Sequence, residues 1–151
     1  MPIKRKGEKW DVPPRVKVLE ALGSIADNRV KIAGNAATVV SSLGERAYRV
    51  MWDGARGIFS DDNGSLWQGY LGYPAIAFLM LKNQLPFEAR LANSLKGIPW
   101  KELNRRFRND YSKTEAEAFR LASAKGVSAR ELELFAEKVL AEIRKAGFVR
   151  L

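Results

Sequence analysis

Residues 66–85 read LWQGYLGYPAIAFLMLKNQL, which is the most apolar stretch of the chain. Its core, AIAFLML at residues 75–81, is apolar on every side, and a helix of this kind is usually buried on all sides. A membrane-spanning helix needs about 20 apolar residues, so this core is too short to cross a bilayer. We therefore expect residues 74–83 to form the central core helix of a soluble domain, with the rest of the chain packed around it.

The chain before this stretch has the pattern of one helix followed by strands. Apolar residues recur at helical spacing over residues 15–26, just after two prolines that suit a first helical turn. Polar and apolar residues then alternate, as in half-buried strands. Short turns such as Gly34-Asn35 separate the strands, which indicates an antiparallel meander. The predicted strands cover residues 29–32, 37–41, 46–52 and 56–60, with a further short strand at residues 66–70.

The chain after this stretch has the pattern of helices. Pro86 and Pro99 begin two of them, and Ser128 with Glu131 forms a capping box before the longest one. The predicted helices cover residues 74–83, 86–95, 99–109, 115–126 and 128–146.

The order of these elements predicts an α+β fold. It has an N-terminal helix, a small antiparallel meander of about four strands, and then about five helices packed on the sheet. Residues 1–10 are predicted as a flexible basic tail. Residues 11–151 are predicted as a single α+β domain, strand-rich over 29–70 and helical over 74–147.

The composition removes several kinds of chemistry. The chain has no cysteine, so disulfides, thiol nucleophiles and thiolate metal sites are excluded. It has no histidine, so the commonest general base near neutral pH and the commonest zinc ligand are missing. Catalysis would have to use carboxylates, Lys, Tyr, Ser or Arg, which counts against an enzyme. We predict no cofactor and no membrane partner, and a cytoplasmic location is the default expectation. The lack of cysteine and the many charges of both signs would suit a thermophile.

Positive charge is concentrated in two segments. The net charge of the chain is +9, which favours polyanionic partners. Residues 1–50 hold 10 basic and 5 acidic residues, a net charge of +5. Residues 88–113 hold 7 basic and 3 acidic residues, a net charge of +4. DNA or RNA is therefore the predicted partner.

The predicted helix at residues 99–109 would present two different sides. One side would dock on the core through its apolar residues, Trp100, Leu103 and Phe107. The other would present a row of cations that matches a phosphate backbone, and Asn and Arg can also read base edges. The predicted nucleic-acid-binding residues on this side are Lys101, Asn104, Arg105 and Arg108. The basic run near the N-terminus would add nonspecific affinity through Lys4, Arg5 and Lys6.

The same helix has the outline of a helix-turn-helix motif. A helix and a tight turn at Gly97 precede it, and the second helix of such a motif enters the major groove. The alternative interpretation is a solvated outer face on which Glu102 and Arg106 form an ion pair.

Two other functions stay open. The chain could be an assembly protein, a homodimer in particular, with the apolar faces of the last two helices as its interface. It could also be an Mg²⁺-dependent enzyme that acts on phosphates, if Asp53, Asp61 and Asp62 meet at one end of the sheet.

Aromatic residues of the sheet region could also stack unpaired bases, although burial against the helices is the commoner use of such side chains. These aromatic residues are Tyr48, Trp52, Phe59, Trp67 and Tyr70.

Overall fold

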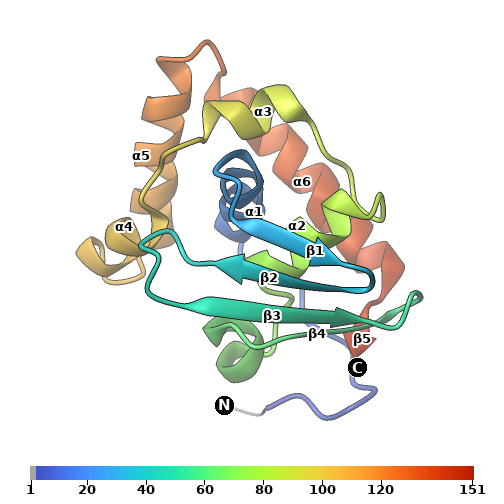
Figure 1. Cartoon of the computed structure of the whole chain (residues 1–151). Helices are drawn as coiled ribbons and strands as arrows, with labels where there is room; N and C mark the ends of the chain where they lie inside the picture. Colours follow the sequence, from blue (N-terminus) through green and yellow to red (C-terminus); the bar gives the residue numbers. More distant parts are fainter. Residues whose placement is uncertain (1–2) are drawn as a thin grey trace.

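The computed structural model describes residues 3–151, and it has the predicted α+β architecture (Figure 1). One helix, α1 (Val16–Ala26), precedes a five-stranded sheet. The strands are β1 (Val30–Ala33), β2 (Ala36–Val40), β3 (Ala47–Trp52), β4 (Gly57–Ser60) and β5 (Val149–Arg150). The α-helices that follow the meander are α2 (Tyr73–Leu81), α3 (Ala89–Ser94), α4 (Trp100–Arg106), α5 (Tyr111–Ser123) and α6 (Ala129–Ala146).

The sheet has the strand order β1-β2-β3-β4-β5. The first four strands pair antiparallel with their neighbours, so the predicted meander is confirmed. Val39 of β2 pairs with Val30 on one side and with Tyr48 on the other, and it is fully buried. The fifth strand, β5, comes from the end of the chain and pairs parallel with β4.

Residues 66–70 do not form the predicted short strand. The chain makes a π-helical turn there instead, η1 (Gly64–Gln68). The buried Asp62 carboxylate holds this turn, because it accepts hydrogen bonds from the backbone N–H and the hydroxyl of Ser65, at 3.2 and 2.7 Å. Gly69 then ends the turn with a φ of 75°. A side chain that bonds to the backbone in this way competes with strand pairing.

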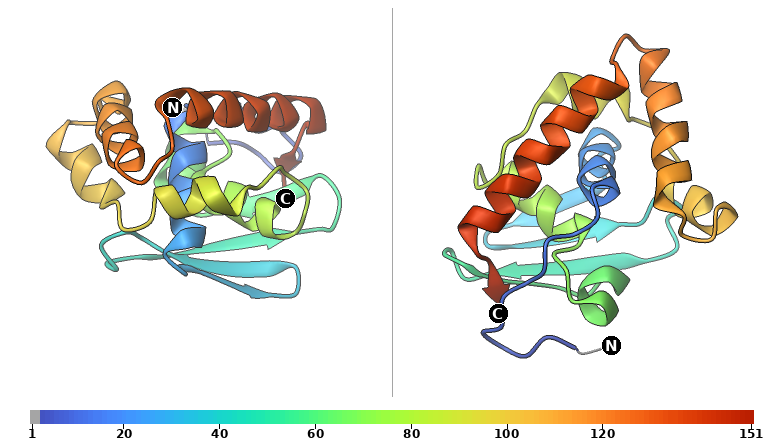
Figure 2. Two further views of the ribbon diagram at one scale, coloured as in Figure 1. Left: turned by 90° about the horizontal axis from the view of Figure 1, so that it is seen from above. Right: turned by 180° about the vertical axis from the view of Figure 1, so that it is seen from behind.

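The helices cover one face of the sheet in layers (Figure 2). α2 contacts β1, β3 and β4, α1 packs on α2, and α6 packs on α1. The predicted central helix is confirmed, because every residue of α2 from Pro74 to Met80 is buried. α2 therefore needs no polar side, since the core surrounds it.

The longest helix, α6, begins at the predicted capping box. The Ser128 hydroxyl accepts a hydrogen bond from the Glu131 N–H at 3.2 Å, and the Glu131 carboxylate accepts one from the Ser128 N–H at 2.9 Å. Gly147 ends the helix with a φ of 65°. Both ends of α6 are therefore determined by local sequence signals.

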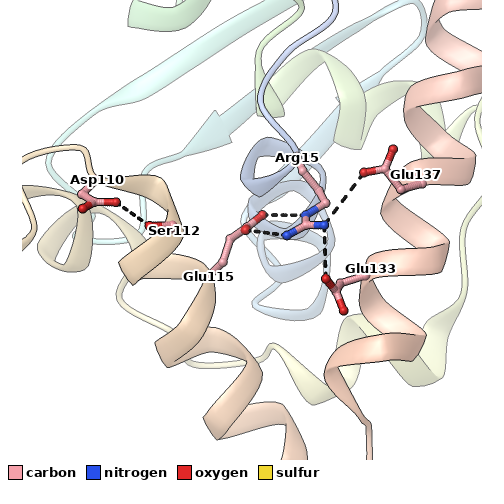
Figure 3. Close-up of polar contacts among 6 residues, drawn as sticks. All are labelled: Arg15, Asp110, Ser112, Glu115, Glu133 and Glu137. Atoms are coloured by element: carbon pink, nitrogen blue, oxygen red, sulfur yellow. Dashed lines mark hydrogen bonds and ion pairs between the residues drawn. The ribbon is translucent and has the colours of Figure 1, made fainter.

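The sequence predicted one helix that ends at residue 109 and another that begins at residue 115. The structure places both of these boundaries elsewhere. α4 ends at Arg106, because Arg108 and Asn109 have φ values of 51° and 62°. α5 begins at Tyr111, where the Ser112 hydroxyl donates to the Asp110 carboxylate at 2.7 Å (Figure 3). The turn between the two helices is therefore short.

Arg15 ties α5 and α6 to the start of α1 (Figure 3). Its guanidinium donates two hydrogen bonds to the Glu115 carboxylate of α5, at 2.9 and 2.8 Å. It also lies 3.3 Å from Glu133 and 3.9 Å from Glu137, both on α6. The hydrogen bonds to Glu115 raise the pKa of Arg15 above its ordinary value, more than burial lowers it.

Residues 7–9, which belong to the 1–10 segment predicted as a flexible tail, lie beside β5, whereas residues 1 and 2 of that segment lie outside the described residues. The Gly7 N–H donates to the Arg150 carbonyl at 2.7 Å. The Trp10 indole donates to the Ile58 carbonyl of β4 at 2.8 Å, and the Trp10 side chain is buried. Residues 7–10 therefore lie beside the C-terminal strand β5 and its neighbour β4.

Candidate functional site

A cleft of about 740 Å³ opens at the end of the sheet where β2 turns into β3. Five parts of the chain line it: α1, Arg29 just before β1, residues 41–48 from the β2–β3 turn into β3, residues 62–73 around η1, and residues 100–111 from α4 to the start of α5. Figure 1 shows α4, η1 and the β2–β3 turn gathered at this end of the molecule. The cleft therefore collects residues that are far apart in the sequence.

Four cationic side chains at the edge of the cleft are termed the rim cations here: Arg46, Lys101, Arg105 and Arg108. Arg46 comes from the β2–β3 turn, Lys101 and Arg105 from α4, and Arg108 from the turn after α4. The side chain of Arg105 is 59% exposed and that of Lys101 is 24% exposed. The structure therefore brings three of the predicted binding cations together, although Arg108 lies beyond the end of the helix.

Glu45 in the β2–β3 turn neutralises part of this charge. Its carboxylate lies 3.0 Å from the Arg105 guanidinium and 3.6 Å from the Lys101 ammonium. The hydrogen bond from Arg105 lowers the pKa of Glu45 below its ordinary value, so this side chain is a carboxylate at neutral pH. Exposed ion pairs of this kind are weak, and a phosphate can compete for the same cations.

Three side chains in the interior, termed the floor here, form a chain made of one ion pair and one hydrogen bond: Lys17, Glu20 and Asn104. The Lys17 ammonium lies 2.8 Å from the Glu20 carboxylate, which also accepts a hydrogen bond from the Asn104 amide at 2.8 Å. The Asn104 carbonyl in turn accepts from the Thr114 hydroxyl of α5 at 2.9 Å. Asn104, which was predicted to contact a base, is therefore buried and engaged at both ends of its amide.

Lys17 is a protonated cation inside the cleft. Burial by itself lowers the pKa of Lys17, but the Glu20 carboxylate and its other neighbours raise that pKa by more, so the net shift is upward. The ammonium lies 4.8 Å from the centre of the Tyr111 ring, a cation–π distance. A buried ion pair carries a large desolvation cost, and ionised groups of this kind in a cleft often mark a binding site.

Aromatic side chains also line the cleft, among them Tyr48, Trp67, Tyr70, Tyr73 and Tyr111. Trp67 lies on η1 and is 53% exposed. Three of the five aromatic residues whose role the sequence left open therefore line the cleft: Tyr48, Trp67 and Tyr70.

The other two of those five pack against the core instead. Trp52 packs edge-on against Phe78 with 5.9 Å between the ring centres, and Phe59 is half-buried.

Two of the cleft tyrosines, Tyr70 and Tyr73, are uncharged at neutral pH. Burial raises the pKa of Tyr70 well above its usual range, although the Lys17 ammonium opposes this shift. Burial also raises the pKa of Tyr73, against the effect of Arg29. Their hydroxyls therefore offer hydrogen bonds without adding charge to the interior.

A model of the family described as "Uncharacterised conserved protein UCP014422" matches residues 10–149. The chain belongs to this family. Searches among curated proteins and solved structures found no match. The matched segment includes the rim cations, the floor and the aromatic residues of the cleft.

The predicted binding residues near the N-terminus do not line the cleft, and they lie outside the family match. Lys4 pairs with Asp11 at 3.0 Å, and neither Arg5 nor Lys6 lines the cleft. Sequence reasoning missed Lys17 and Arg46. Only the basic character of residues 1–50 pointed to them, because the fold brings them to α4 from elsewhere in the chain.

The three aspartates proposed as Mg²⁺ ligands each hold a different turn. Asp53 accepts hydrogen bonds from the N–H groups of residues 55 and 57, and Asp61 accepts one from the Arg49 N–H at 2.7 Å. Asp62 holds η1, as described above. Within the described part of the chain, no group of three or more His, Cys, Asp or Glu side chains could hold a metal ion.

The apolar side of α6, which was considered as a dimer interface, is buried within the fold. Its buried residues include Leu132, Phe135, Val139 and Ile143. Across residues 3–151, no helix is both long enough and apolar enough to cross a membrane.

Proposed function

We propose that the chain is a nucleic-acid-binding module and that the cleft beside α4 is its binding surface. The observation that carries this proposal is the convergence of the rim cations, from two separate segments, on a cleft that also presents tyrosines and an exposed tryptophan. Arg and Lys side chains bind phosphate oxygens, and aromatic rings stack on bases. A cleft that presents both cations and aromatic rings suits nucleic acid better than it suits a polyanion without aromatic groups.

The proposed contact differs from that of a helix-turn-helix protein. The cations Lys101 and Arg105 of α4 face the β2–β3 turn, because both pair with Glu45 of that turn. A reading helix needs its basic side free to enter a major groove. We therefore assign the contact to the cleft as a whole, with α4 as one of its walls.

Replacing Arg105 and Arg108 together with Ala tests this assignment. Binding of labelled single-stranded DNA, double-stranded DNA and RNA is measured by fluorescence anisotropy at several salt concentrations. Loss of two phosphate contacts is expected to weaken binding about tenfold or more, and to lower the slope of log affinity against log salt by about 2. Circular dichroism is expected to show an unchanged fold, since Arg105 and Arg108 are exposed.

The matched control replaces Arg130 and Lys138 with Ala, because both lie exposed on α6 outside the cleft. This variant loses the same charge and is expected to retain most of the affinity. Equal losses in the two double variants would show that net charge alone causes binding. An Arg105/Arg108 variant that binds as tightly as the parent would remove the cleft from consideration.

A further inference from the structure

The cleft has its excess positive charge at the edge and a charge-balanced interior. The rim cations lie at the edge, where Arg46, Arg105 and Arg108 are exposed. The two cations farther inside each have a carboxylate partner: Lys17 lies 2.8 Å from Glu20, and Arg29 lies 3.5 Å from Asp27. The edge thus suits phosphates, and the interior suits an uncharged group.

The interior also has the surfaces that a flat ring needs. Four tyrosines line it with hydroxyls that can donate or accept hydrogen bonds: Tyr48, Tyr70, Tyr73 and Tyr111. Small-molecule pockets have volumes of about 300 to 1,000 Å³. The cleft, at about 740 Å³, lies within this range. A nucleobase is a flat ring that stacks on aromatic side chains and carries hydrogen-bonding edges.

We infer that the cleft binds one unpaired nucleotide of a single strand, with the base in the interior and the neighbouring phosphates on the rim cations. This inference rests on the proposed function and adds the form of nucleic acid that is bound. In a duplex the bases are paired and stacked, so they must leave the stack before a pocket can hold them. A duplex could reach the rim cations but would leave the interior empty.

Trp67 is the side chain that we assign to base stacking. It is 53% exposed, whereas Trp10 and Trp100 are 5% and 2% exposed. Leaving a large aromatic ring in water is unfavourable, and a stacked base would remove that surface from water. Asp62 holds η1 through its hydrogen bonds to Ser65, so the turn that carries Trp67 is held in place beside the cleft.

The test compares three forms of one sequence by anisotropy: a single strand, a hairpin duplex closed by a linker that carries no bases, and a single strand that is abasic at every position. The intact single strand is expected to bind about tenfold more tightly than the other two forms, since only this form offers an unpaired base that can stack on an aromatic ring. Trp67→Ala is expected to weaken the intact strand about five- to tenfold and to leave the abasic strand unchanged. Trp67→Phe is expected to retain most of the affinity, because it keeps a ring on η1.

The control variant is Phe87→Ala, because Phe87 is an exposed aromatic residue outside the cleft. It is expected to bind all three forms as the parent does. If the parent binds the hairpin and the abasic strand as tightly as the intact strand, the inference fails and the proposed function stands. If no form binds, the proposed function itself fails. A mononucleotide that competes as well as the intact strand would overturn the assignment to a strand. Equal losses for the intact and abasic strands in Trp67→Ala would overturn the stacking role.

Discussion

Glu45 competes with a phosphate for two of the rim cations. Replacing it with Gln removes a negative charge beside Lys101 and Arg105 and leaves a side chain of nearly the same shape. We expect Glu45→Gln to bind nucleic acid about two- to fivefold more tightly, with a steeper salt dependence, because more positive charge is then available at the edge. Anisotropy at two or more salt concentrations measures both effects.

The control for this residue is Glu102→Gln. Glu102 pairs with Arg106 at 3.0 Å, and neither residue lines the cleft. This variant makes the same change in net charge and is expected to alter affinity much less. An affinity for Glu45→Gln that equals the parent's would mean that Lys101 and Arg105 do not reach the ligand.

At the scale of the element, the capping box of α6 is expected to make the stability of this helix depend on pH in the acid range. The pKa of Glu131 is about 2, compared with an ordinary 4.5, chiefly because Arg90 donates a hydrogen bond to it at 2.6 Å and the Ser128 N–H donates another. Since the folded-state pKa lies below the unfolded one, this stabilisation is complete above pH 4.5 and is lost as the pH falls through about 2.

Thermal unfolding of the parent and of Glu131→Gln, followed from neutral pH to pH 2, measures this dependence. The parent is expected to have the higher Tm at neutral pH, and the difference is expected to shrink below pH 4.5. Glu142→Gln removes an exposed carboxylate from the same helix and serves as the control. A difference in Tm that stays constant into acid would show that the charge of Glu131 does not stabilise α6.

At the scale of the whole molecule, Arg15 joins three helices that are distant in the sequence. Arg15→Ala would leave the buried Glu115 carboxylate without its guanidinium partner. Breaking a buried pair costs about 3 to 5 kcal/mol, but Arg15 is partly exposed, so we expect a loss of about 2 kcal/mol in the free energy of unfolding. Urea denaturation measures this change.

Arg120→Ala is the matched control, because Arg120 is exposed and pairs with Glu117 within α5. It removes the same type of side chain from an ion pair that lies within a single helix. We expect it to change stability little. Equal effects of the two substitutions would mean that Arg15 does not hold the helices together.

Elements with strong local signals could be predicted from the sequence. α2 has no polar side, and α6 has a capping residue at Ser128 and a glycine stop at Gly147. Residues 66–70 were wrongly predicted as a strand, because η1 depends on Asp62 being buried next to Ser65, and burial follows from the whole fold. β5 has two residues and no local pattern, since its pairing with β4 is long-range.

The cleft could be predicted only in part, because proximity in sequence revealed only one of its walls. Lys101, Arg105 and Arg108 lie within eight positions of one another, so their grouping was visible. Lys17 and Arg46 reach the same cleft only because α1 and the β2–β3 turn are folded against α4. The position of a charge-balanced, aromatic interior behind a cationic edge is a property of the tertiary structure.

The pairing between the segment around Gly7 and β5 has a consequence for the folding of this chain during its synthesis. N-terminal regions generally begin to fold during synthesis, before later residues are made. Trp10 can bond to Ile58 once β4 exists, but Gly7 must wait for Arg150. A nascent chain can therefore complete its meander while the segment around Gly7 still lacks its partner. β5 is made long after the segment around Gly7, and the two pair only when both are present.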